Sequence, residues 1–333
     1  MSVLRPVSAQ SIISIPWMSS KSLAHAMRDV SLRGPNSPET WTSLQSRGDM
    51  IAHSFSSKHS ALMLSALARV RHLNPELVNS AFVSRFVNRI LFPSVWNTCN
   101  SLDVSQILHA MISFPDFLLV LKETIKSDPS FLSDKIKEMD PNSLSMTSLA
   151  LSKLSLSSLF VGDVLMRVNS IECTNDQLIG QVLQLVASNP GEAHLYVEEL
   201  HTLCTPLADR LDQVSVRSLT LITSSLVKIA KHTHLDFLSE YTSMLVPLMD
   251  IPDKGASLKQ LAVLLHAVYY LAKVVPPALV EAIRRKGVSD ADGATIYLLA
   301  SGYPDKQSLR DWAVCHQANI DSSLLDRISK RLL

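Results

Sequence analysis

Three side chains near the middle of the chain have the types and the spacing that a metal site requires. His194, His201 and Cys204 are separated by seven and three residues, so a helix would place them on one face. Imidazole nitrogen and thiolate sulfur are ligands that zinc prefers, and Glu198 lies between them in the sequence. However, histidine and cysteine are also ordinary packing residues of half-buried helices. We favour the packing interpretation, and we expect no bound metal and no cofactor.

Motifs for catalysis are missing from the sequence. The chain has no Walker loop, no GxSxG elbow, no HExxH pair and no glycine fingerprint for a dinucleotide. Its many serines are not accompanied by a recognisable base and oxyanion motif. We therefore predict that the protein is not an enzyme, that it has no catalytic residue and that it takes no small-molecule substrate.

Basic residues gather in one segment of the chain. The candidate RNA-binding residues of this segment are Lys58, Arg69, Arg71, Arg85 and Arg89. Glu76 is the single acid between the first and the last of them. The net charge of the whole chain is only +1, so any contact with nucleic acid would have to be local. A solvated helix surface that faces an acidic neighbour explains the same residues, and both interpretations stand.

The composition of the chain favours helices. Among 333 residues, 47% are hydrophobic, 6% are aromatic and only nine are glycine, so strand-forming residues and hairpin turns are scarce. Charged residues make up 18%, below the roughly 25% of an average soluble domain. A surface with so few charges is easily buried against partners. We therefore expect an all-α protein that packs on other proteins.

A two-residue motif recurs within leucine-rich segments at nearly constant spacing. Its second residue is apolar, and its first is small in four copies and Lys153 in the fifth. In the five clearest copies the second residue is Leu67, Met111, Leu154, Leu226 and Val268. The first three of these are 44 and 43 residues apart, and the last two are 42 residues apart. Stacked helical hairpins produce such a period. The sequence therefore predicts helical-hairpin repeats with a period of about 42 residues, stacked as an α-solenoid.

Helix start signals and prolines divide the chain into repeats. The expected N-cap residues of the repeated helices are Ser57, Asp103, Ser143, Thr174, Ser215 and Ser257. Partner helices are expected at residues 75–90, 116–127, 159–168, 193–203, 235–248 and 277–286, after a first helix at 39–53. The repeat array is expected to span residues 37–307, and residues 308–333 are expected to form capping helices.

Residues 1–36 form an extension ahead of the predicted array. From Met1 to Arg28 the extension has three basic residues and no acid amid many serines. This composition is typical of a mitochondrial or plastid transit peptide, and an unstructured serine-rich terminus is the alternative. We favour a mitochondrial targeting segment and expect a location on the matrix side.

Cysteine spacing and hydropathy indicate the redox environment of the chain and its relation to a membrane. The cysteines Cys99, Cys173, Cys204 and Cys315 lie far apart without a CxxC pair, as expected of free thiols in a reducing compartment. The longest apolar run, from Leu261 to Ala272, is shorter than the roughly 20 residues that a membrane-spanning helix needs. We therefore predict no membrane span.

Three segments share a serine start and a leucine-rich helix with a central alanine: SSKHSALMLSALARV, SLDVSQILHAMISF and ASLKQLAVLLHAVYYLA. In this they resemble the helical repeats of organellar proteins of the FAST-kinase-like and RAP-associated group, which includes octotricopeptide and heptatricopeptide types. The resemblance covers about Ser37 to Gly302. It implies RNA processing in mitochondria or plastids, or a place in a divergent mitochondrial ribosome. The near-neutral charge and the absence of a recognisable RAP-type domain distinguish this chain from that group.

From these features we expect a non-catalytic helical-repeat subunit of a mitochondrial ribonucleoprotein, above all a mitochondrial ribosome. Its expected partners are protein subunits of a large assembly, with rRNA as a candidate partner at the basic segment. The alternative is a protein-only scaffold or assembly subunit of an inner-membrane energy complex, such as a respiratory complex or ATP synthase. A particle that contains RNA would favour the first hypothesis over the second.

Overall fold

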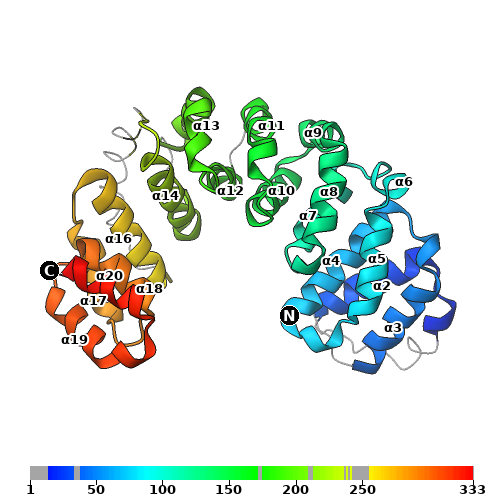
Figure 1. The fold of residues 1–333 in the computed structure, drawn as a ribbon, viewed down its shortest axis with the longest axis horizontal. Coiled ribbons are helices and arrows are strands. Elements are labelled where there is room, and N and C mark those ends of the chain that lie inside the picture. The colour runs from blue at the N-terminus through cyan, green and yellow to red at the C-terminus, as the bar shows by residue number, and fades with distance from the viewer. Residues whose placement is uncertain are drawn as a thin grey trace. The chain divides into compact units, whose positions relative to one another are not determined.

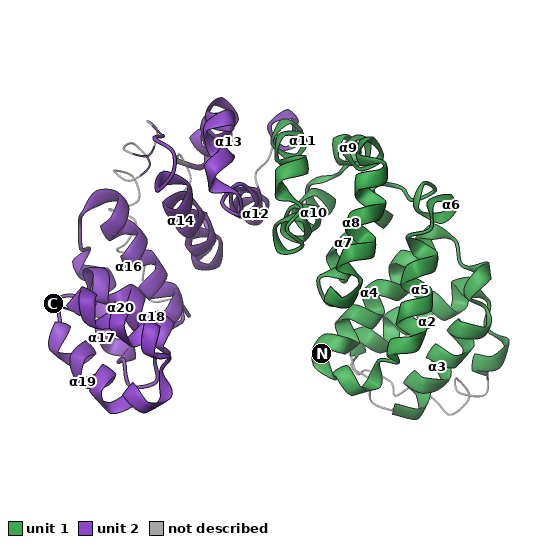
Figure 2. Ribbon diagram, in the orientation of Figure 1, with its two compact units in different colours: residues 1–167 green, residues 168–333 purple. Residues whose placement is uncertain are grey.

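The computed structural model describes residues 14–33, 38–171, 175–208, 213–235, 238, 241 and 255–332. Within these residues every regular element is a helix, which confirms the all-α prediction (Figure 1). The chain divides into two compact units, residues 1–167 and residues 168–333 (Figure 2). Each unit is described by itself.

Unit 1 contains four helices that pack in series. Its elements are η1 (Ile15–Trp17), α2 (Ser20–Arg33), α3 (Pro38–Met50), η2 (Ala52–Ser54), α4 (Ser57–Leu73), η3 (Pro75–Leu77), α5 (Ser80–Ile90), α6 (Pro93–Trp96), α7 (Ser101–Met111), η4 (Pro115–Phe117), α8 (Leu118–Ser127), α9 (Pro129–Glu138), α10 (Pro141–Lys153) and α11 (Ser157–Ser170). The last three residues of α11 belong to unit 2. Helix α2 packs on α4, α4 on α7 and α7 on α10. We call these four the A helices of unit 1, and the α-helices between and beside them its B helices.

Unit 2 follows the same plan. Its elements are α12 (Asp176–Val186), η5 (Pro190–Tyr196), α13 (Val197–Ala208), α14 (Val216–Ala230), α16 (Leu258–Ala272), α17 (Pro277–Lys286), α18 (Gly293–Gly302), α19 (Lys306–His316), η7 (Gln317–Asn319) and α20 (Ser322–Leu332). Helix α12 packs on α14, α14 on α16, α16 on α18 and α18 on α20, and we call these five the A helices of unit 2. Within each unit the helices thus stack in series, as they do in an α-solenoid.

The A helices form because each buries apolar side chains against its neighbours. In α4, Leu64, Leu67 and Val70 have no exposed surface. Met111 in α7 and Val268 in α16, which align with Leu67 in the sequence repeat, are also buried. A fully buried aliphatic side chain of this size stabilises the fold by about 1.5–3 kcal/mol, and an isolated hairpin could not supply the burial. Serial packing is therefore the source of stability.

Two predicted helix starts are wrong by three residues. Helix α7 begins after Asn100, whose side chain accepts the Asp103 backbone N–H at 2.8 Å, and Asp103 in return accepts the Asn100 N–H at 3.3 Å. Asp103 is therefore the third helical residue of a capping box rather than the N-cap. Helix α10 begins after Asp140, which accepts the Ser143 N–H at 3.0 Å and is followed by a proline in the first turn.

The remaining starts differ less from expectation. Ser215 and Ser257 are N-caps, as predicted. Helix α4 is capped by Ser56 rather than by Ser57, because the Ser56 hydroxyl accepts the His59 N–H at 3.4 Å. Thr174 lies outside the described residues, as does most of the partner helix expected at 235–248.

The spacing of the A helices is irregular. Helices α4, α7 and α10 begin at Ser57, Ser101 and Pro141, intervals of 44 and 40 residues, whereas α16 and α18 begin 35 residues apart, at Leu258 and Gly293. The short helix α9 is inserted between the partner helix α8 and the next A helix, α10, and the sequence patterns did not predict it. A fixed period of about 42 residues stays a prediction.

The sequence predicts no membrane span, and its longest apolar run lies in α16. Among the described residues, no single helix is both long enough and apolar enough to cross a membrane. Helix α7 and the segment Pro115–Ser127 pass that test only as a pair, and they are bent by 115° relative to each other.

Part of the predicted N-terminal extension is a helix of the fold. Helix α2 packs on α4, and its Leu23, Ala24 and Met27 have no exposed surface. Removing residues 1–36 would therefore uncover the buried face of α4. Targeting by this segment stays a prediction, and residues 1–13 lie outside the described part of the chain.

We predict that α2 is needed for the stability of unit 1. Leu23→Ala and Met27→Ala should each lower the free energy of unfolding by about 2–5 kcal/mol, because each removes a fully buried side chain. The control Leu32→Ala lies on the same helix but is 57% exposed, so its effect should stay within about 0.5 kcal/mol. Urea unfolding followed by circular dichroism measures the difference. Equal effects for all three variants would show that α2 does not belong to the folded unit.

Candidate functional site

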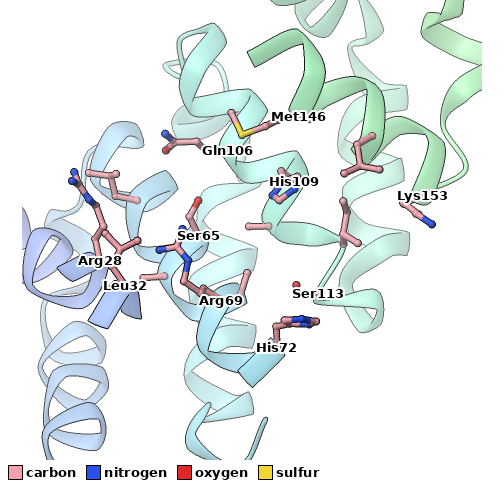
Figure 3. Close-up of a pocket in the computed structure, with 16 residues that line it drawn as sticks. Arg28, Leu32, Ser65, Arg69, His72, Gln106, His109, Ser113, Met146 and Lys153 are labelled. Atoms are coloured by element: carbon pink, nitrogen blue, oxygen red, sulfur yellow. The ribbon is translucent and has the colours of Figure 1, made fainter. Parts of the chain in front are cut away.

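A groove crosses the four A helices of unit 1 (Figure 3). It has a volume of about 670 Å³. Its lining residues are Arg28, Leu32, Leu62, Ser65, Ala66, Ala68, Arg69, His72, Gln106, His109, Ala110, Ile112, Ser113, Met146, Leu149 and Lys153. All of them lie on α2, α4, α7 or α10, or directly after α7, so the A helices alone build the groove.

Helical spacing explains why these side chains share one surface. On α4, Leu62, Ser65, Arg69 and His72 follow one another at steps of three or four residues, and this spacing keeps them on one face. The remaining faces of α4 are buried against α2, α7 and the B helices. The groove therefore consists of the one stripe of each A helix that packing leaves open.

The floor of the groove is apolar and partly formed by short side chains. Ala66 and Ala110 occupy corresponding positions in α4 and α7, and they are only 1% and 2% exposed. Longer side chains, among them Leu62 and Met146, line the groove around them. The short methyl groups leave open the space that a leucine at either position would fill.

Every formal charge in the groove is positive. Arg28, Arg69 and Lys153 are its charged residues, and none of the sixteen lining residues is a carboxylate. The Arg69 guanidinium donates to the Ser31 hydroxyl at 3.2 Å, which holds Arg69 against α2. Arg28 lies 3.9 Å from Asp29, an exposed pair that water screens strongly. The groove therefore offers an anionic ligand three cations above an apolar floor.

Two histidines add polar groups to the groove. His72 lies on the last turn of α4, and His109 lies on α7 near the middle of the groove (Figure 3). Partial burial between the groove walls lowers the pKa of His109 below its ordinary value. At pH 7 its imidazole is therefore neutral and can both donate and accept one hydrogen bond.

Of the five residues predicted to bind RNA, the structure places only Arg69 in the groove. Arg71 points to another neighbour: its guanidinium lies 3.6 Å from the Asp116 carboxylate and 5.0 Å from the centre of the Phe114 ring. Lys58 is exposed on the first turn of α4. Burial, together with the nearby charges of His25 and Lys58, lowers the pKa of His59.

Arg85 and Arg89 lie together on α5 and bind to unit 1 itself. Arg85 makes two hydrogen bonds to the Asp49 carboxylate, at 2.9 and 2.5 Å. Arg89 donates to the His53 carbonyl at 2.6 Å. Both side chains are thus held against the chain that precedes them, and α5 does not contribute to the groove. The five residues belong to one segment of the sequence, 58–89, but lie in different parts of unit 1.

Sequence reasoning missed Arg28, His109 and Lys153. They lie on three different A helices, so no local cluster of charge marks them. A weak signal was available, because Arg28, Arg69 and Lys153 each fall on the exposed stripe of a helix that buries its apolar residues. Only the packing of these helices shows that the stripes meet.

The three residues considered as metal ligands have separate environments. His194 lies on η5 and is exposed, and its Nδ1–H donates to the Gly191 carbonyl at 2.8 Å. His201 is exposed on α13, whereas Cys204 is only 3% exposed. Within the part of the chain that the structure describes, no three His, Cys, Asp or Glu side chains are placed to hold a metal ion.

Comparisons with known proteins were made for the whole chain. Neither the protein-family models nor the curated protein sequences contain a match. Inferences about function therefore depend on the residues and surfaces of this chain.

We predict that thiol reactivity separates the described cysteines. Cys99 and Cys204 are 2% and 3% exposed, and burial raises the pKa of each to about 12, so almost no thiolate is present at pH 7. Cys315 is exposed. In a Cys173→Ser variant, one thiol per folded chain should react with Ellman's reagent, and three should react in urea. Three fast-reacting thiols in the folded protein would contradict the packing of α13 and of the segment before α7.

Proposed function

We propose that the chain is a non-catalytic helical-repeat subunit of a mitochondrial ribonucleoprotein, above all a mitochondrial ribosome. In this proposal the chain packs on protein subunits and holds rRNA locally in the groove of unit 1. The observation that supports RNA as a ligand is the set of three cations in a groove without a carboxylate. Positive charge in a lining that holds no carboxylate favours phosphate groups.

The groove suits a short stretch of RNA better than a long duplex. Arginine can bind a phosphate through two parallel hydrogen bonds, and Arg28 and Arg69 supply two such groups. The apolar floor can contact the faces of unpaired bases. With at most three phosphate contacts, the logarithm of affinity should fall with the logarithm of salt concentration at a slope of about −2. This modest electrostatic contribution agrees with a net charge of +1.

Exposed apolar side chains support contacts with protein neighbours. Large examples on the B helices are Leu119 on α8, which is 68% exposed, and Met166 on α11, which is 59% exposed. With charged residues at only 18%, such surfaces lose little hydration energy when a partner covers them. A subunit inside a large assembly would use them as interfaces.

The second candidate is a protein-only scaffold or assembly subunit of an inner-membrane energy complex. The observation that favours it is the internal pairing of the basic segment: Arg71 lies beside Asp116, and Arg85 is bound to Asp49. In this case the groove would hold an acidic segment of a protein partner. The RNA content of the purified native particle separates the two candidates, because the scaffold predicts none.

The groove is tested by reversing its charges. In the variant Arg28→Glu, Arg69→Glu and Lys153→Glu, binding to short single-stranded RNA should weaken, and the salt slope should fall by about 2. The control Lys122→Glu, Lys126→Glu and Lys137→Glu makes the same change in net charge on α8 and α9, away from the groove. Fluorescence anisotropy at several salt concentrations measures both.

The control variant and a third variant decide whether the groove is the RNA site. Equal losses of binding in the groove variant and in the control would mean that net charge, and not the groove, attracts RNA. A variant with Lys58→Glu, Arg85→Glu and Arg89→Glu tests the remaining basic residues, and a larger effect there would move the RNA site to α4 and α5. Circular dichroism of each variant excludes unfolding as the cause.

A further inference from the structure

A second concave site lies within unit 2. It is lined by residues of the region where α16, α18 and α20 pack in series, and Figure 1 shows these helices. It has a volume of about 590 Å³. We call it the tyrosine pocket, and the side chains that characterise it are Tyr269, Tyr270, Lys273, Tyr303, Lys306 and Arg331. They come from α16, from α20 and from the junction of α18 with α19. No pattern in the sequence singled them out.

The tyrosine pocket concentrates positive charge without a counter-ion. None of its lining residues is a carboxylate, and none of the ion pairs in the described part of the chain includes Lys273, Lys306 or Arg331. Lys306 donates to the Ala300 carbonyl at 2.5 Å, and Arg331 donates to the Tyr297 carbonyl at 3.1 Å. Both side chains retain further donors. Burial and the neighbouring arginines lower the pKa of Lys306, so an anion in the pocket would relieve the repulsion.

Aromatic rings stand beside these cations. The Lys273 ammonium lies 5.6 Å from the centre of the Tyr269 ring and 5.2 Å from that of Tyr270. Lys231 of α14 lies 5.2 Å from the same Tyr270 ring. Cations next to half-buried tyrosines combine the two chemistries that recognise a nucleotide, namely phosphate pairing and stacking on a base.

His266 supplies a hydrogen-bond acceptor in the same pocket. The Ser301 hydroxyl donates its single hydrogen to the Leu298 carbonyl at 2.6 Å. The contact of 2.8 Å between His266 Nδ1 and that hydroxyl must therefore be donated by the histidine. Burial and the nearby Arg331 and Lys231 lower the pKa of His266 to about 4, so its Nε2 is an unprotonated acceptor at pH 7. A phosphodiester has no hydrogen to donate to this atom, whereas a ribose hydroxyl has one.

We propose that the tyrosine pocket binds one ribonucleotide unit. Its phosphate would lie against Lys273, Lys306 and Arg331, its base against the Tyr270 ring, and a ribose hydroxyl would donate to His266. The ribonucleotide could belong to an RNA chain or be a free nucleotide. The first case rests on the proposed function, whereas the second does not depend on that proposal. This site is separate from the groove of unit 1, so each can be tested without the other.

The test removes charge from the pocket while preserving the fold. Lys273 ends α16 with φ 57°, a left-handed conformation that asparagine tolerates, so the test variant is Lys273→Asn with Arg331→Gln. The control is Arg285→Gln with Lys330→Gln, which removes the same charge from exposed positions outside the pocket. Lys330 is adjacent to Arg331 but pairs with Asp326 at 2.6 Å. Both variants should retain the circular dichroism of the wild type.

Binding is measured by calorimetry with AMP, 2′,3′-dideoxy-AMP and inorganic phosphate, and by anisotropy with a short labelled oligouridine. The pocket variant should bind AMP and oligouridine roughly tenfold more weakly than the wild type, and the control should bind normally. The wild type should prefer AMP to the dideoxy analogue.

The outcomes separate this inference from the proposed function. Binding of AMP at the pocket without any binding of RNA would retain the pocket and remove the ribonucleoprotein proposal. If the wild type does not bind AMP and the pocket variant binds oligouridine normally, the pocket inference is overturned. In that case, a loss of RNA binding in the groove variant alone would leave the proposed function intact.

Discussion

Serial packing of the A helices is the interaction on which this structure depends, and α4 and α7 each lie between two others. An α-helix has a limited circumference, and neighbours in the series cover two sides of it while a B helix covers a third. In α4 this arrangement leaves no exposed surface on Leu64 and Leu67 and keeps one stripe open. The surface available for ligands is therefore decided by the same contacts that stabilise the fold. A change in helix register would alter both the ligand surface and the stability of the fold.

The basic residues that meet on the open stripes are mostly not those that cluster in the sequence. Arg85 and Arg89 lie four residues apart in the basic segment, yet Asp49 and the His53 carbonyl bind them. Arg28 and Lys153 are isolated in the sequence, yet α2, α4, α7 and α10 bring them to one groove. The nearly neutral net charge thus conceals local surfaces that lack any carboxylate. Such surfaces attract phosphate at short range and add little attraction at long range.

The sequence predicted much of the fold because helix signals are local. The helical class, the N-caps Ser215 and Ser257, and the bounds of α17 followed from composition, capping and proline placement. Serine-rich α2 was interpreted as part of an extension, since its apolar residues suggest a helix of the fold only when α4 is present to cover them. Capping residues were misplaced where aspartate or asparagine three residues earlier competes for the same amides, as at Asp140.

The candidate sites could not be predicted in the same way. The groove and the tyrosine pocket each combine side chains from several helices, and only tertiary packing specifies which stripes meet. Lys306 and Arg331 illustrate this, because a turn and two helices separate them in the chain while both line one pocket. The residue types predicted helices at these positions. Only the folded structure shows that neither the groove nor the tyrosine pocket has a carboxylate in its lining.

The most direct test of RNA binding by the open stripes is ultraviolet crosslinking of the native particle, with identification of the crosslinked peptides by mass spectrometry. We expect crosslinks to peptides from α2, α4, α7 and α10, concentrated on the residues that line the groove. Crosslinks confined to the B helices, or a native particle that contains no RNA, would contradict this expectation.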